Sequence, residues 1–261
     1  RRSGGRSDAS HATGNRRSRL RLRRRHGRCV SVSDVKVQSF RDRTFLVRKG
    51  QTHPEFSFFT FEEEERDIRE KYWNVQEGDV VVDVGASYGS YTLAACAMGA
   101  KKVFAYEPEP TVWVDLVRNL DLNRWHEADP ELSRCVPFCM GLWSVEGVVS
   151  MKSYAPHWPS HTISGDYAVT TLDRLSASDR FPDRLDWIKV DVEGAEEHVL
   201  KGAKFTIAKF HPKLLVECHT FLDPEMVNKV KDILKWAIRS PWGPYNFEEI
   251  DRPPCVMLVA R

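Results

Sequence analysis

Short apolar runs alternate with amphipathic segments along most of the chain. The runs lack the polar–apolar alternation of a half-exposed strand, which predicts strands buried on both faces of a sheet, at residues 77–85, 101–110, 135–144, 185–194 and 212–219. Helical segments are predicted between and after them, at residues 90–98, 111–123, 195–203 and 222–236. Strands that alternate with helices indicate an α/β fold with a mostly parallel, doubly wound sheet.

The two ends of this pattern differ from its centre. Residues 35–50 alternate and end in glycine, which predicts a hairpin, and a helix with an acidic first turn is expected at 61–73. Residues 245–261 indicate two strands around a Pro-Pro turn, so we expect an antiparallel C-terminal hairpin at one edge of the sheet. Residues 151–167 have no period and are expected to form a loop.

Charge is distributed unevenly between the first residues and the rest. Residues 1–28 hold eleven arginines and no lysine against one acid, Asp8, so this segment carries about +10 and leaves about −8 for the remainder of a +2 chain. We therefore predict a basic, disordered arm at 1–33 and a folded domain at 34–261, in which 34–74 is the N-terminal hairpin and helix. Three interpretations of this arm are open. It could bind nucleic acid or an anionic surface, it could be an organelle transit peptide, or it could be an extension without function.

The cysteines and the apolar runs indicate a protein of the cell interior. Several of the six cysteines lie in apolar contexts, as in LAACAM and LLVECH, where a free thiol behaves as a small buried hydrophobe. No apolar run approaches the roughly 20 residues that cross a bilayer. We therefore expect reduced cysteines, no transmembrane segment and a cytoplasmic protein, with organelle targeting by the arginine-rich N-terminus as the alternative.

The first buried strand ends in a turn that two kinds of enzyme use. Residues 85–89 match G-x-S-x-G, the nucleophile elbow of serine hydrolases, and Ser87, Asp191 and His219 follow in the order of such a triad. An α/β-hydrolase places this elbow after several strands, whereas here it follows the first strong strand, and the sequence has no HGGG-type oxyanion motif. The serine hydrolase is therefore a remote alternative.

A cofactor suits the same turn better. Ligands of such sheets collect at the carboxyl ends of the strands, where Asp83 and Gly85 end one strand and Glu107 ends the next, twenty-four residues after Asp83. A dinucleotide loop needs a further glycine near position 87, where this chain has serine, so no pyrophosphate cradle forms. Glu107 is well placed to accept hydrogen bonds from ribose hydroxyls. A ribose without a pyrophosphate describes S-adenosyl-L-methionine.

Five segments of the chain occur in a recognisable order: DVGASYGSYT, AYEPEP, TLDRL, DWIKVDVEGAEEHVLKGA and PKLLVECH. Over roughly residues 75–220 this ordered set closely resembles the FkbM family of S-adenosylmethionine-dependent methyltransferases. The resemblance implies the class I methyltransferase fold, which is Rossmann-like, and O-methylation of a sugar or a related small-molecule hydroxyl. The family's loop more often has asparagine where this chain has Ser87, which is shorter but keeps a hydrogen-bonding group.

The cofactor is expected to contact the turn, the strand ends beside it, and the end of the third strand, where class I enzymes hold adenine by backbone and apolar contacts. The expected cofactor-binding residues are Asp83, Gly85, Ala86, Ser87, Tyr88, Gly89, Thr92, Glu107, Pro108, Gly141, Leu142 and Asp191. Gly85 and Gly89 allow the backbone to approach the methionyl group, and Asp83 orients the loop or binds the ammonium group.

Charged residues on the fourth and fifth strands are the candidates for the chemistry. Lys189, Asp191 and Glu193 alternate along one strand, His219 ends the next, and these four are the expected catalytic residues. Asp191 is expected beside the transferred methyl group as general base or substrate anchor, with His219 assisting it or serving as the base. The alternatives are a structural ion pair of Lys189 and a divalent metal ion on Asp191, Glu217 and His219. We favour a metal-free site, because three mixed ligands on two strands are a weak metal signature.

The sequence therefore predicts an S-adenosylmethionine-dependent O-methyltransferase that acts on a hydroxyl of a saccharide or small metabolite. Tyr154, His157, Trp158 and His161 belong to the irregular segment 151–167, which is either a substrate lid or a solvated loop. A nucleic-acid-directed methyltransferase or binder that uses the arginine-rich arm is the alternative. The acidic body, which repels phosphate, and the lack of an NPPY-type motif count against it. The sequence specifies neither the particular acceptor nor an oligomeric state.

Overall fold

The structure is a computed structural model of the 261-residue chain and describes residues 35–48, 66–151, 165–237 and 244–261. Residues 35–261 form one compact unit. The basic arm predicted at 1–33 and the four residues of the candidate lid lie outside the described residues. No helix in the described ranges is long and apolar enough to cross a membrane.

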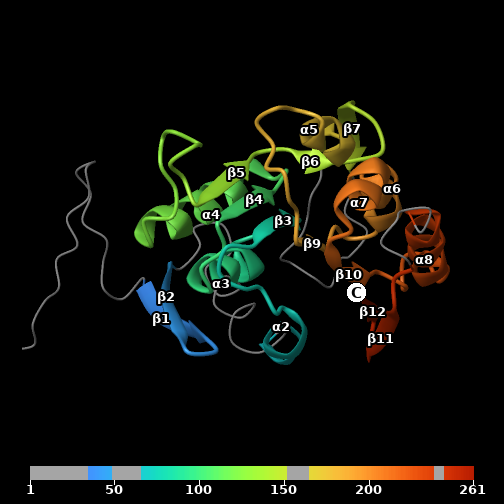
Figure 1. The fold of residues 1–261 in the computed structure, drawn as a ribbon, viewed down its shortest axis with the longest axis horizontal. Helices are drawn as coiled ribbons and strands as arrows, with labels where there is room; N and C mark the ends of the chain where they lie inside the picture. The colour runs from blue at the N-terminus through green and yellow to red at the C-terminus, as the bar shows by residue number, and fades with distance from the viewer. Residues whose placement is uncertain (1–34, 49–65, 152–164, 238–243) are drawn as a thin grey trace, which may run out of the picture. The chain divides into compact units, whose positions relative to one another are not determined.

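The described part of the unit is built on a seven-stranded sheet (Figure 1). Its strands are β3 (Val80–Val84), β4 (Lys102–Tyr106), β5 (Cys135–Phe138), β9 (Trp187–Val190), β10 (Lys213–Cys218), β11 (Phe247–Arg252) and β12 (Cys255–Ala260). They are arranged in the order β11–β12–β10–β9–β3–β4–β5. Strand β12 pairs antiparallel with both β10 and β11, while the other neighbours pair in parallel. This arrangement confirms the mostly parallel sheet with an antiparallel C-terminal hairpin.

Apolar side chains on both faces hold the sheet between two layers of helices. Every residue of β3 and of β9 is buried, and successive side chains point to opposite faces. One face packs against α2 (Arg66–Tyr72), α3 (Ser90–Ala97) and α4 (Pro110–Leu122). The other face packs against α5 (Leu172–Ser176), α6 (Glu196–Lys201), α7 (Lys204–Phe210) and α8 (Met226–Ala237). The sheet is therefore doubly wound, as predicted.

Strand β3 lies where the strand order reverses. The chain continues from β3 to β4 and β5 on one side, and later adds β9 and β10 on the other side. In open α/β sheets, ligands bind in the crevice outside the carboxyl ends of the strands at such a reversal. The fold therefore directs attention to the residues that follow β3, β4, β9 and β10.

A smaller sheet corrects two expectations. The run predicted as one strand at 135–144 forms β5 and then β6 (Gly141–Leu142), which leaves the main sheet and pairs with β8 (Gly165–Thr170). Strand β7 (Gly147–Met151) pairs antiparallel with β8, so both ends of the segment predicted as a loop are strands. The side chains of β7 are largely exposed, so it lacks the apolar pattern that marks a buried strand.

The N-terminal hairpin predicted from residues 35–50 is present as β1 (Val35–Phe40) and β2 (Arg43–Arg48), which pair antiparallel. Asn119 of α4 and Asn123, which caps the C-terminus of that helix, bind the open edge of β2. Asn119 Oδ1 accepts from Arg48 N at 2.8 Å, and Asn123 accepts from Leu46 N at 2.8 Å and donates to Leu46 O at 2.7 Å. Side-chain amides thus complete the backbone pairing that an edge strand leaves open.

Candidate active site

Backbone contacts fix the turn between β3 and α3. Gly85 N and Ala86 N both donate to Tyr106 O at 2.9 Å, which ties the turn to the end of β4. Gly85 has φ +75°, and a Cβ at this position would lie 1.7 Å from the carbonyl oxygen of Asp191, just after β9. Only glycine fits there, so the turn and the ends of β4 and β9 meet at one point.

Ser87, in the middle of the turn, adopts left-handed backbone geometry with φ 50°. Its N–H donates to Glu107 Oε2 at 2.9 Å, while its Oγ is buried with no hydrogen-bond partner among the described residues. A serine nucleophile needs a base within hydrogen-bond reach, and the ring nitrogens of His219 face Glu193 and Glu196 instead. The described residues therefore do not form the Ser87–His219–Asp191 triad of a hydrolase.

Glu107 presents a carboxylate at the end of β4 and is only 5% exposed. Its Oε2 accepts from Ser87 N and its Oε1 from Glu109 N, both at 2.9 Å. Burial raises the pKa of Glu107 to about 7, against the opposing effect of these two N–H groups. Each oxygen keeps a further lone pair, so Glu107 can accept hydrogen bonds from neighbouring hydroxyls.

Asp83 and Lys189 form a buried ion pair beneath the turn. Asp83 Oδ2 accepts from Thr92 Oγ1 at 2.6 Å, and its Oδ1 lies 3.6 Å from Lys189 Nζ. Burial raises the pKa of Asp83, and the charge of Lys189 opposes that shift. Lys189 Nζ also donates to Gly85 O at 3.0 Å and to Asp191 Oδ2 at 3.2 Å. This is the geometry of the ion-pair alternative for Lys189, and complete burial favours the loop-orienting role of Asp83.

The other expected cofactor residues divide by where their side chains point. The side chains of Ala86, Tyr88 and Thr92 are buried in the interior, and the hydroxyl of Thr92 donates to Asp83. Gly141 lies beside Pro108, because a Cβ on Gly141 would be 3.9 Å from Pro108 Cβ. The structure thus brings the start of β6 next to the residue that follows Glu107. Leu142 is buried in the core. Gly89, the remaining member, has φ 101° and is the N-cap of α3.

His219 follows β10 and is buried among three acids. Its Nδ1 lies 2.7 Å from Glu196 Oε1, and its Nε2 lies 3.3 Å from Glu193 Oε2 and 3.8 Å from Asp191 Oδ1. Burial by itself lowers the pKa of His219. Hydrogen bonds with Glu193 and Glu196 and the charges of Glu196 and Asp191 outweigh that effect and raise the pKa to about 12. This environment favours the charged form of His219, whereas a general base acts in its neutral form.

Sequence reasoning missed Glu196, the first residue of α6. Glu196 is fully buried. Its Oε1 accepts a hydrogen bond from Gly194 N at 3.0 Å and also lies 2.7 Å from His219 Nδ1. The only signal in the sequence was the pair Glu196–Glu197 at a helix start, where either acid suits the helix dipole. Topology alone decides that the first of the two points inward.

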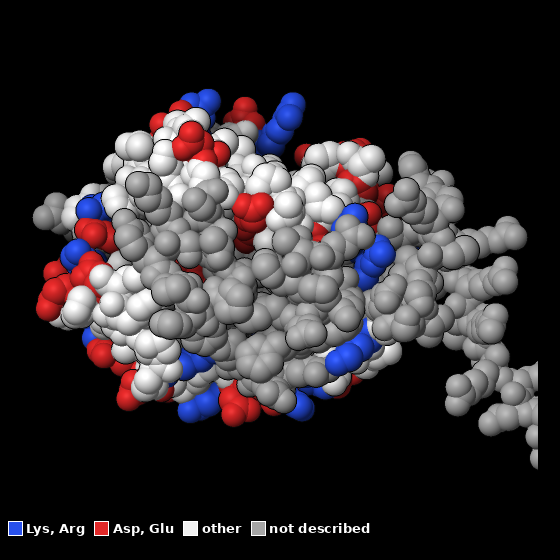
Figure 2. All heavy atoms as spheres, turned by 180° about the vertical axis from the view of Figure 1, so that it is seen from behind, with Lys and Arg blue, Asp and Glu red and all other residues white. Residues whose placement is uncertain are grey.

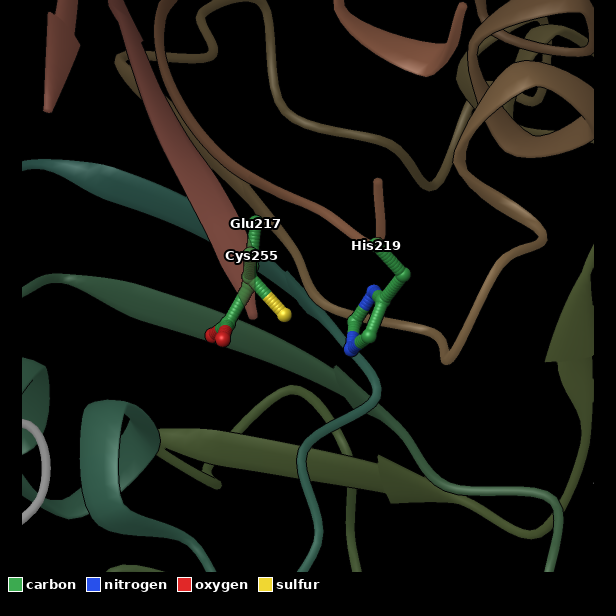
Figure 3. Close-up of side chains that lie close together, drawn as sticks. All are labelled: Glu217, His219 and Cys255. Carbon is green, nitrogen blue, oxygen red and sulfur yellow. The ribbon is translucent and has the colours of Figure 1, made fainter. Parts of the chain in front are cut away.

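Two groups of potential metal ligands share His219. One consists of Asp191, Glu193 and His219, and the other of Glu217, His219 and Cys255 (Figure 3). Asp191 and Glu217 lie in different groups, so the set of Asp191, Glu217 and His219 considered from the sequence is not one of those found in the described ranges. Both oxygens of Glu217 accept from Arg252 Nη1 at 3.1 Å, which fixes the carboxylate.

The surface charge is mixed on the face shown in Figure 2. Along the left and lower margins of that face, basic and acidic side chains of the described residues are interspersed. A protein that tracks a nucleic-acid backbone needs a run of positive charge. Those margins therefore offer no continuous basic track.

Three features define a class I methyltransferase domain. A glycine turn follows β3, an acid follows β4, and the antiparallel strand β12 is inserted between β10 and the edge strand β11. Residues 83–240, more than half of the chain, match the methyltransferase FkbM domain. The chain therefore belongs to the FkbM family of S-adenosylmethionine-dependent methyltransferases, which confirms the predicted family and fold class.

Two curated relatives extend the comparison. The chain is 32% identical over 161 residues to the hexuronic acid methyltransferase AglP of Haloferax volcanii, which covers 59% of this chain and 62% of that protein. It is 29% identical over 167 residues to the methyltransferase sdnD of Sordaria araneosa, which covers 49% of this chain and 62% of that protein. The chain thus spans about three fifths of the length of each relative.

The fold is also similar to a solved structure of the family. The methyltransferase FkbM from Methylobacillus flagellatus KT superposes with a TM-score of 0.52 at 20% identity, over 72% of this chain and 44% of that chain. Similarity at this level of identity concerns the fold alone.

Proposed function

We propose that this chain transfers a methyl group from S-adenosyl-L-methionine to a hydroxyl group of a saccharide. The observation that carries the proposal is the meeting of the glycine turn, the carboxylate of Glu107 and the acids around His219 at one edge of the sheet. Membership of the FkbM family supports the cofactor. Similarity to a protein named as a hexuronic acid methyltransferase supports a sugar acceptor.

The residues at the strand ends fit this cofactor. Glu107 offers carboxylate oxygens for the ribose hydroxyls, and Pro108 and Gly141 border the region where the adenine would lie. Ser87 Oγ, a buried polar atom without a partner among the described residues, is available to the methionyl group. In this arrangement the turn binds the methionyl group and Glu107 binds the ribose. The residues at the end of β5 contact the adenine.

S-adenosyl-L-methionine supplies a sulfonium-bound methyl group that is already activated, so the protein has mainly to position the acceptor. Asp191 is 20% exposed, and its two oxygens face Lys189 and His219. A carboxylate oriented in this way can accept the hydrogen bond of a sugar hydroxyl and take its proton as the new bond forms. Glu193, 40% exposed beside it, can hold a second hydroxyl.

An apolar rim beside these acids suits a sugar ring. Phe221 and Leu222 are 43% and 41% exposed, although they adjoin the buried cluster. The ring of Phe221 lies 5.8 Å from that of His219, and Leu222 N donates to His219 O at 3.0 Å. A pyranose has polar edges and apolar faces, so acids on one side and an aromatic ring on the other match its two kinds of surface.

The experiment that tests the function is a methyl-transfer assay with labelled S-adenosyl-L-methionine. The acceptors are neutral hexosides, hexuronic acids and their oligomers, small metabolites, and RNA. We expect label in a saccharide pool, as an ether methyl group that resists mild alkali. Base-labile label would identify a methyl ester on a carboxylate instead, and label confined to RNA would support the nucleic-acid alternative.

Site variants separate positioning from folding. Asp191→Asn is expected to lower kcat by roughly 10²–10⁴-fold, the usual contribution of a general base, while S-adenosyl-L-methionine still binds. The matched control is Glu197→Gln. Glu197 follows Glu196 in α6 and pairs with Lys201 and Lys229, so this variant should retain activity. Full activity in a folded Asp191→Asn variant would exclude Asp191 as the base.

A further inference from the structure

The end of β10 and the start of β12 bring together a carboxylate, an imidazole and a thiol. One potential ligand atom each from Glu217, His219 and Cys255 lies within 4.8 Å of the other two. Figure 3 shows the sulfur of Cys255 directed toward the histidine ring, with the carboxylate of Glu217 on the other side of that sulfur. His219 and Cys255 are buried, and Glu217 is mostly buried.

The sheet itself sets this juxtaposition. In the antiparallel pairing of β10 with β12, Glu217 lies opposite Met257 and Cys218 opposite Val256. His219 follows the last paired residue of β10, and Cys255 precedes the residues of β12 that pair with β10, so the two lie at the same end of this strand pair. The pairing of β10 with β12 therefore brings the imidazole and the thiol near each other.

The neighbours of this cluster orient its ligands as they do in metal sites. Glu196 Oε1 lies 2.7 Å from Nδ1 of His219, so a metal would take Nε2, which here lies 3.3 Å from Glu193 Oε2. A histidine ligand that donates its other N–H to a carboxylate is the common arrangement around zinc. Arg252 binds Glu217 through the single nitrogen Nη1, so the carboxylate is oriented by a hydrogen bond, as ligating carboxylates usually are.

We propose that Glu217, His219 and Cys255 bind a thiophilic divalent ion, with zinc as the preferred metal. The donor set of one sulfur, one nitrogen and one carboxylate oxygen suits zinc and disfavours magnesium or calcium, which take oxygen ligands. Zinc–ligand bonds of about 2.0–2.3 Å require the three atoms to approach one another further. Rotation of the Cys255 side chain, together with release of one Glu217 oxygen from Arg252, would supply that movement.

The exchange is balanced in charge. The ion replaces the proton of the Cys255 thiol and the proton on Nε2 of His219, so two protons leave as one M²⁺ enters. The net charge of the buried cluster therefore stays the same. Because no positive charge is added, the neighbouring Arg252 is not repelled more strongly than before. The ion would join the C-terminal hairpin to β10, and through His219 it would adjoin Asp191, the acid proposed to act in methyl transfer.

The test uses the full, untagged chain stripped with a chelator, and needs neither S-adenosyl-L-methionine nor an acceptor. We expect one zinc per chain after dialysis, a higher Tm with zinc than without, and a thiolate-to-cobalt charge-transfer band when Co²⁺ is added. Cys255→Ser should lose the band and the Tm increase, and Glu217→Gln should weaken cobalt binding at least tenfold. Cys139→Ser, which removes an exposed free thiol, is the matched control and should keep both signals.

Three results would overturn the proposal: no stoichiometric zinc or cobalt in the folded wild type, a charge-transfer band that persists in Cys255→Ser, or a loss of metal in Asp191→Asn together with a preference for Mg²⁺ or Mn²⁺. The last result would move the ion to the group formed by Asp191, Glu193 and His219. Circular dichroism of each variant distinguishes lost binding from lost folding.

Discussion

Replacing Glu107 by alanine is predicted to weaken the binding of S-adenosyl-L-methionine without unfolding the protein. In the structure each carboxylate oxygen accepts one backbone N–H, from Ser87 and from Glu109. The remaining lone pairs can receive the two adjacent hydroxyls of a ribose. The variant therefore removes the acceptor for the ribose and also releases the N–H of Ser87 in the cofactor turn.

The magnitude follows from the kind of bond that is lost. A hydrogen bond to a charged group contributes about 1.5–3 kcal/mol, which corresponds to an increase in Kd of roughly 10- to 150-fold. Burial raises the pKa of Glu107 to about 7, so affinity in the wild type should rise as pH increases through about 7 and the carboxylate forms. In the protein without cofactor, the free energy of unfolding should fall by roughly 3 kcal/mol as pH rises from about 4.5 to 7. The unfolded chain loses the Glu107 proton in this range, whereas the folded state still holds it.

Titration calorimetry at pH 6, 7 and 8 measures both effects. Glu127→Gln, which removes an exposed acid ahead of β5, is the matched control and should bind the cofactor like the wild type. Thermal melts establish that Glu107→Ala is folded. An unchanged Kd in the folded variant, or affinity for NAD equal to that for S-adenosyl-L-methionine in the wild type, would refute the assignment of Glu107 to the ribose.

Three further predictions concern the rest of the chain. Lys189→Met should lower the free energy of unfolding by about 3–5 kcal/mol in urea titrations, because Asp83 is then buried without its cation, whereas the exposed Lys101→Met should have little effect. Phe221→Ala should raise the KM for a saccharide about two- to tenfold at nearly constant kcat, the range for loss of an aromatic contact; a fall in kcat alone would contradict the ring-stacking role. Deletion of residues 1–33 should leave the Tm and the methylation of a small acceptor unchanged, and a large loss that high salt reproduces would favour the nucleic-acid alternative.

The sequence predicted the main sheet because burial on both faces leaves continuous apolar runs. VVV in β3 and LLV in β10 have no polar interruption, and each was followed by a turn and a helix. Prediction failed where burial is one-sided or slight. Strand β7 is largely exposed, and its pairing with β8 depends on a contact between distant segments that no local pattern records.

The site was partly predictable for the same reason. Strand ends are visible in the sequence, so Glu107, Asp191 and His219 could be named, and parallel strands bring their carboxyl ends together. The position of Cys255 near His219 depends instead on the register of an antiparallel strand inserted from the C-terminus. The inward orientation of Glu196 depends on how α6 packs. Both follow from tertiary arrangement and leave no local signal.

The buried charges around Lys189 decide which acid remains available to a substrate. Burying an ammonium group in the centre of a sheet is costly unless acids pair with it, and Asp83 supplies that charge while remaining fully buried. Asp83 cannot turn toward a ligand without leaving Lys189 short of a partner. Asp191 has a second cation at His219 and is partly exposed, so it can exchange one partner for an acceptor hydroxyl. Of the two acids beside Lys189, we therefore propose that Asp191 takes part in methyl transfer and that Asp83 does not.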